Sequence, residues 1–76
     1  MPRITPIDYK RLVKVFELAG FRWTRERGDH LVYTRLDCPR PVVIPKWDEV
    51  PVFIIKNNLR TAQMSREEYF EYLSRT

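Results

Sequence analysis

The sequence predicts one α+β domain of two layers, in which helices cover one face of a three-stranded antiparallel sheet. Helical segments at both ends flank a central run of short β-rich segments that turn residues separate. We expect residues 1–76 to form a single domain, which buries about 60% of the surface that its unfolded chain exposes. The second face of the sheet is then left for solvent or a ligand.

The first helix is predicted over residues 6–19. Thr5 is the expected N-cap, because a proline follows it at the first helical position and Asp8 comes three residues later, near the positive helix end. Gly20 supplies the left-handed residue that ends the helix. The apolar positions at helical spacing are Leu12, Val15, Phe16 and Ala19.

Three strands are predicted next, as an antiparallel meander. Their aromatic and β-branched content places them at residues 21–27, 30–36 and 42–44. The pair Gly28-Asp29 marks a hairpin between the first two strands. A second turn is expected at residues 37–40, and Pro45 ends the third strand.

Two helices complete the predicted domain. Pro51 opens a segment whose β-branched residues also suit a strand, but Val52, Ile55 and Leu59 recur with a helical period, so we predict a helix. A Ser65–Glu68 capping box begins a short last helix. Both helical groups are expected on the same side of the sheet.

Charge and cysteine content narrow the classes of partner and cofactor. The net charge of +4 and the pI near 9.6 favour a polyanion or an acidic protein. Cys38 is the only cysteine and no Cys/His cluster has zinc spacing, so we expect no disulfide, no metal and no other cofactor. No apolar stretch approaches the roughly 20 residues of a membrane span. We expect a cytoplasmic protein that does not bind membranes.

The segment Arg25–His30 carries the strongest candidate site. An imidazole exchanges a proton close to neutral pH, and the guanidinium groups of Arg25 and Arg27 match phosphate oxygens. With RNA, a neutral His30 could take the proton of the ribose 2′-hydroxyl, whose oxygen would attack the adjacent phosphorus and give a 2′,3′-cyclic phosphate. DNA lacks this hydroxyl and could not be cleaved in this way. The alternative is a structural histidine beside solvated arginines.

The sheet face that carries His30 depends on the length of the hairpin loop. A two- or four-residue loop places His30 with Phe21, Trp23 and Arg25. A three-residue loop places it with Arg22, Thr24 and Glu26. We expect the three-residue loop, because it exposes His30 and gathers four apolar residues on the opposite face: Phe21, Trp23, Leu31 and Tyr33. The aromatic residues are expected in the core, with base stacking as the alternative for Trp23, Tyr33 and Trp47.

The order and spacing of these motifs resemble the HicA family, small bacterial toxins of toxin–antitoxin pairs that are also called YcfA-like proteins. The resemblance extends from about Thr5 to Leu73. The motifs that carry it are Gly20-Phe21, Gly28-x-His30, Ile44-Pro45 and Ser65-Arg66-Glu67-Glu68-Tyr69-Phe70. It implies a double-stranded-RNA-binding-domain-like fold, α-β-β-β-α, here with a short extra C-terminal helix. It also implies translation-independent cleavage of mRNA and neutralisation by a HicB-type antitoxin.

The resemblance maps the family's catalytic histidine onto His30, with two departures nearby. Members commonly have serine at the position of Asp29, where this chain places a negative charge that would repel a phosphate. Members often have a second histidine at the position of Trp47. If that histidine assists chemistry or RNA binding, Lys46 or Trp47 must take its place.

The residues and the resemblance together imply a toxin that is a metal-independent mRNA endoribonuclease. His30 is the expected general base or acid, and Arg25, Arg27 and Lys46 are the expected RNA contacts. Two alternatives stay open. One is a non-catalytic RNA-binding module of the same fold, and the other is a domain that only docks an acidic antitoxin-like protein.

Overall fold

The computed structural model describes residues 3–76, so the first two residues of the predicted domain lie outside the described part. The elements in chain order are α1 (Tyr9–Leu18), β1 (Arg22–Arg27), β2 (His30–Thr34), β3 (Val42–Pro45), α2 (Val52–Ala62) and α3 (Arg66–Leu73). The strands form one antiparallel sheet in the order β1-β2-β3. The predicted α+β, double-stranded-RNA-binding-domain-like fold is confirmed.

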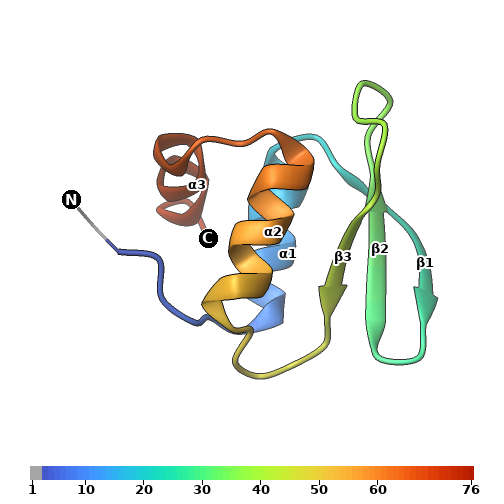
Figure 1. Cartoon of the computed structure of the whole chain (residues 1–76), viewed down its shortest axis with the longest axis horizontal. Helices are drawn as coiled ribbons and strands as arrows, with labels where there is room; N and C mark the ends of the chain where they lie inside the picture. Colours follow the sequence, from blue (N-terminus) through green and yellow to red (C-terminus); the bar gives the residue numbers. More distant parts are fainter. Residues whose placement is uncertain (1–2) are drawn as a thin grey trace.

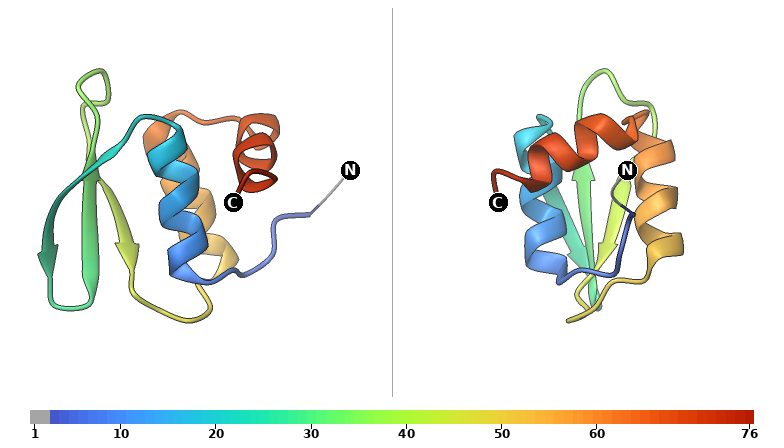
Figure 2. Two further views of the ribbon diagram at one scale, coloured as in Figure 1. Left: turned by 180° about the vertical axis from the view of Figure 1, so that it is seen from behind. Right: turned by 90° about the vertical axis from the view of Figure 1, so that its left-hand side faces the viewer.

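The helices all lie on one side of the sheet and leave its other face open (Figure 1). Helices α1 and α2 lie side by side against the sheet, whereas α3 crosses behind them, on the side away from the strands (Figure 2). The Arg11 side chain of α1 ties the end of α3 in place, because its Nη2 donates to the carbonyl of Leu73 over 3.2 Å and its Nε to the Thr76 hydroxyl over 2.7 Å. Among residues 3–76, no helix is long and apolar enough to cross a membrane.

The core lies between the sheet and the two helices that cover it. The predicted apolar stripe of α1 is fully buried at Leu12, Val15 and Phe16, and Ile55 of α2 is buried against it. Tyr69 brings α3 into the same core. The helical reading of the segment after Pro51 is confirmed, because its apolar period matches the face that packs against the sheet.

The start of α1 differs from the prediction. Asp8, not Thr5, is the N-cap, and its Oδ1 accepts a hydrogen bond of 2.8 Å from the backbone of Lys10. The cause is a contact with a distant segment: the Val50 N–H donates to the Ile7 carbonyl over 2.7 Å, which holds the chain before Asp8 extended. The helix end at Gly20 (φ +96°) and the Ser65 capping box are as predicted.

The hairpin loop between β1 and β2 has two residues, Gly28 and Asp29, so the expected three-residue loop was wrong. Arg27 pairs directly with His30 across the turn. Gly28 takes a φ of +57° at the first loop position, where a two-residue hairpin favours glycine. His30 therefore shares a sheet face with Arg25 and Arg27, and it is exposed as expected.

A bulge at Thr24 explains why the predicted apolar group still lies on one face of the sheet although the predicted loop length was wrong. Trp23 pairs with Tyr33, but Arg25 pairs with Val32, so β1 holds one extra residue between these two pairs. The extra residue changes which side of the sheet the following side chains occupy. The four apolar residues share the helix-facing side, while the arginines that follow the bulge turn outward.

Strand β1 extends beyond the cover of the helices. Its residues are all exposed, and Trp23 keeps 56% of its surface accessible although it lies on the helix-facing side. Tyr33, its cross-strand neighbour on β2, is 4% exposed and belongs to the core. The core assignment therefore holds for Tyr33, while Trp23 lies at the uncovered edge.

Candidate functional site

The open face of the sheet brings His30, Arg25 and Arg27 together. They line a shallow hollow of about 360 Å³ whose remaining walls are Val32, Pro41 and Val43. Val32 is only 7% exposed, yet it points away from the main core and forms the floor of this hollow. The site thus combines one imidazole and two guanidinium groups with an apolar floor.

The two arginines of the hollow are free to bind an anion. Arg25 and Arg27 are both exposed, and neither side chain forms a hydrogen bond or an ion pair in the part of the chain that the structure describes. Arg22 lies on the same face of β1, opposite Thr34, and extends the row of positive charge along the strand. Unpaired guanidinium groups on an open face are suited to phosphate contacts.

His30 does not stand alone, because Asp29 and Trp47 form a chain of contacts with it. The Nδ1 atom of His30 lies 2.9 Å from Oδ1 of Asp29, and the Trp47 indole N–H donates to Oδ2 of the same carboxylate over 3.1 Å. The backbone N–H of Lys46 also donates to the Asp29 carbonyl over 2.6 Å. These contacts join the hairpin turn to the segment that follows β3.

The Asp29 carboxylate is held in its ionised form. The hydrogen bond from Trp47 is the main cause that lowers its pKa below the ordinary 3.8, and His30 adds to the effect. Both carboxylate oxygens are thus engaged with donors on the hairpin side of the hollow.

Lys46 lies apart from the other predicted RNA contacts. Its Nζ atom is 3.2 Å from Oε2 of Glu26, and Lys46 is not among the residues that line the hollow. Glu26 faces the opposite side of β1 from Arg25 and Arg27. The structure therefore brings three of the four predicted site residues together and places the ammonium group of the fourth on a glutamate nearby.

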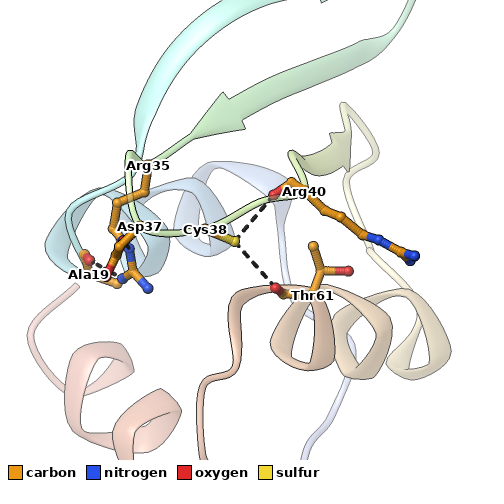
Figure 3. A network of polar contacts seen from close by, with 6 residues as sticks. All are labelled: Ala19, Arg35, Asp37, Cys38, Arg40 and Thr61. Atoms are coloured by element: carbon orange, nitrogen blue, oxygen red, sulfur yellow. Dashed lines mark hydrogen bonds and ion pairs between the residues drawn. The ribbon is translucent and has the colours of Figure 1, made fainter.

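The far end of β2 carries a second polar cluster (Figure 3). There Arg35 donates from Nη1 to the Ala19 carbonyl over 2.7 Å, forms an ion pair with Asp37 and lies 4.5 Å from the centre of the Phe21 ring. Cys38 is half-buried, and its thiol lies 3.3 Å from the Thr61 carbonyl. These contacts attach the β2–β3 loop to α1 and α2. Within residues 3–76, no group of three or more His, Cys, Asp or Glu side chains is placed to hold a metal ion.

These features define a class: a small α+β protein of the double-stranded-RNA-binding-domain-like fold, with its histidine and a row of arginines on the open sheet face. The family model for the HicA toxin of bacterial toxin-antitoxin matches residues 9–64. The chain therefore belongs to the HicA toxin family, is a toxin of a toxin–antitoxin system and has an antitoxin as its partner. A comparison with curated proteins gives no match.

The contact between Asp29 and Trp47 is the part of the site that sequence reasoning missed. Each residue was noted as a departure from the family pattern, but the hydrogen bond between them was not foreseen. The register of β2 against β3 was the signal that could have shown it, because His30 pairs with Pro45 on β3 and the segment that carries Trp47 follows directly. The apolar floor was missed as well, although Val32 and Val43 occupy alternate positions on the strands that carry His30 and Pro45.

Proposed function

We propose that this toxin is a metal-independent endoribonuclease that cleaves mRNA in the bacterial cytoplasm without the ribosome. One observation supports the proposal: an exposed histidine lies beside two arginines with unpaired side chains on the open face of the sheet. The imidazole supplies proton transfer and the guanidinium groups supply charge stabilisation, which are the two requirements of phosphodiester cleavage by an internal hydroxyl.

The proposed reaction is an internal transfer at phosphorus. His30 accepts the proton of the ribose 2′-hydroxyl, and the 2′-oxygen forms a bond to the adjacent phosphorus while the bond from phosphorus to the 5′-oxygen breaks. The leaving 5′-oxygen takes a proton from water. The products are a 2′,3′-cyclic phosphate and a 5′-hydroxyl end, and His30 returns its proton to solvent.

Arg25 and Arg27 are proposed to hold the scissile phosphate and to balance the charge that develops on it. Lys46 is proposed as a weaker contact, which exchanges Glu26 for a phosphate when RNA is bound. The exchange is inexpensive because both side chains of that ion pair are more than a third exposed, where ion pairs contribute little.

The decisive experiment compares RNA cleavage by the purified wild-type chain and by His30→Ala. We expect cleavage by wild type, with cyclic-phosphate ends, and a loss of about 100- to 10,000-fold in the variant. Arg75→Ala is the matched control, because Arg75 follows α3 and pairs with Glu71 of that helix, away from the sheet, so its removal should leave the rate unchanged. A DNA strand of the same sequence stays intact. Equal cleavage by wild type and His30→Ala, or no cleavage by either, contradicts the proposal.

We further propose that the antitoxin is a HicB-type protein with an acidic surface, which covers the hollow. The unpaired arginines and the apolar floor on the open face support a partner that offers both carboxylates and apolar side chains. A neighbouring gene that encodes a small acidic protein would provide the candidate. That protein should co-purify with the toxin and stop RNA cleavage; binding to the partner without any cleavage of RNA by the free toxin favours a non-enzymatic role.

A further inference from the structure

The contacts around His30 determine which of its two nitrogens bears the hydrogen. An ionised carboxylate only accepts hydrogen bonds, and the indole N–H only donates. Since Oδ1 of Asp29 lies 2.9 Å from Nδ1 of His30, the negative carboxylate favours the tautomer of the neutral imidazole that carries its hydrogen on Nδ1. Nε2 is then the bare nitrogen, and it has no hydrogen-bond partner among the described residues.

Trp47 holds the Asp29 carboxylate in its position beside His30. Its indole N–H occupies Oδ2 of Asp29, so the carboxylate cannot turn away without losing one of its two side-chain donors. The Lys46 N–H bond to the Asp29 carbonyl holds the backbone of the same residue. Asp29 is thus held by His30 at the start of β2 and by Lys46 and Trp47 in the segment after β3.

Trp47 also limits the rotation of the imidazole directly. The two rings meet edge to face, with 6.4 Å between their centres and 66° between their planes. Trp47 keeps 40% of its surface exposed. Its ring therefore packs against one side of His30 without burying the imidazole. His30 itself lines the hollow together with Arg25 and Arg27.

We propose that Asp29 and Trp47 are positioning residues for His30: the indole holds the carboxylate, the carboxylate keeps the hydrogen on Nδ1, and Nε2 is the atom that accepts the 2′-hydroxyl proton. The proposal rests on the proposed function and adds the atom that reacts and the two residues that present it. It also gives Trp47 a role in the chemistry without any contact with RNA.

The test measures the hydrogen on the imidazole and the cleavage rate separately. Long-range ¹H–¹⁵N NMR spectra report which ring nitrogen is protonated, and the chain has one histidine, so the signals need no further assignment. At a pH where the imidazole is neutral, we expect wild type to carry the hydrogen on Nδ1. Asp29→Ala should shift the hydrogen toward Nε2, and Trp47→Phe, which keeps an aromatic ring and removes the N–H, should give a mixture.

The cleavage rate at saturating RNA should fall by about 10- to 100-fold in Asp29→Ala and by about 3- to 10-fold in Trp47→Phe. RNA affinity should not weaken in either variant, since neither residue is a phosphate contact. Glu71→Ala is the matched control for the loss of one negative charge, because Glu71 lies on α3 and pairs with Arg75. Circular dichroism checks that each variant is folded.

Two results would overturn the inference. One is a wild-type imidazole that bears its hydrogen on Nε2, and the other is an Asp29→Ala protein with an unchanged tautomer and an unchanged rate. If wild type cleaves no RNA at all, the proposed function fails, while the NMR measurement still decides whether Asp29 and Trp47 orient His30.

Discussion

The two ends of β2 use the same kind of side chain in opposite ways. At the turn end, Arg25 and Arg27 face solvent beside His30 and have no protein partner among the described residues. At the loop end, Arg35 is engaged by a carbonyl, a carboxylate and an aromatic ring. Positive charge alone therefore does not distinguish these arginines; the number of protein groups that each guanidinium group contacts does.

Location in the fold explains the contrast. Arg35 comes where the chain leaves the sheet and passes over the end of α1, so the Ala19 carbonyl, which has no partner inside the helix, accepts its hydrogen bond. Arg25 and Arg27 lie on an edge strand whose outer face no helix covers (Figure 1). An open face leaves guanidinium donors to water or to a ligand.

The largest effect should come from removing both arginines at the turn end. In Arg25→Ala/Arg27→Ala, RNA affinity and cleavage should fall by about 100-fold, from roughly 1.4 kcal/mol for each charge-assisted contact. The dependence of log affinity on log salt should become shallower by about 1.4, as for two lost contacts with a single strand. Thermal unfolding should stay as in wild type. An unchanged salt dependence would show that the two arginines do not contact phosphate.

The reverse pattern is expected at the loop end. Arg35→Ala should lower the free energy of unfolding by about 1–2 kcal/mol, because it removes a half-buried hydrogen bond and the contact with Phe21. Urea denaturation measures this. Arg40→Ala, in the same loop, is the control: its side chain points away from the cluster (Figure 3), so the change should stay within about 0.5 kcal/mol. Equal free energies of unfolding for Arg35→Ala and Arg40→Ala would show that the contacts of Arg35 do not stabilise the fold.

A smaller effect on RNA binding is expected at Lys46, which is exposed like Arg25 and Arg27 but has a protein partner like Arg35. Its ammonium group has a protein partner, Glu26, but one that is exposed. Lys46→Ala should therefore weaken RNA binding by less than about threefold, and Glu26→Ala should strengthen it slightly by freeing the lysine. Filter binding at low salt measures both. A loss in Lys46→Ala as large as that in Arg27→Ala would mean that Lys46 is a full member of the site.

The smallest effect is the pH dependence of stability that Asp29 contributes at the hairpin turn. Because the native-state pKa of Asp29 lies below 3.8, its bonds to Trp47 and His30 add stability above that value and lose it as the pH falls through the lower, native pKa. The indole N–H resonance of Trp47 should therefore show an acidic step below about 3.8, where the carboxylate that accepts its hydrogen bond becomes protonated. In Asp29→Asn this acidic step should vanish. A step that persists in the variant would assign it to another carboxyl.

Features that depend on neighbouring residues were predictable from the sequence, and features that depend on distant contacts were not. The Ser65–Glu68 capping box and the helix end at Gly20 are local, and both are present as predicted. The start of α1 was not, because a bridge from Ile7 to Val50 decides it. The cluster of Arg25, Arg27 and His30 followed from their closeness in sequence, but the partner of Asp29 lies on another segment of the chain.

Thr24 in the hairpin is a second feature that could not be predicted from neighbouring residues. Side-chain alternation counted back from the turn predicts the wrong face for Phe21 and Trp23, unless the extra residue at Thr24 is known. Nothing in the composition of that segment distinguishes Thr24 from its neighbours as a bulge. Its hydroxyl lies 2.7 Å from that of Thr34, a contact that only the paired strands reveal.

The bulge at Thr24 also makes the toxin sensitive to a kind of mutation that substitutions do not test. Loss of this one residue would change no side chain of the proposed site, yet it would remove the bulge that shifts the alternation of side chains along β1. The chain would have to turn either Trp23 and Phe21 out of the core or the arginines away from His30. An in-frame deletion of Thr24 should thus disrupt the proposed site while leaving His30, Arg25 and Arg27 in the sequence.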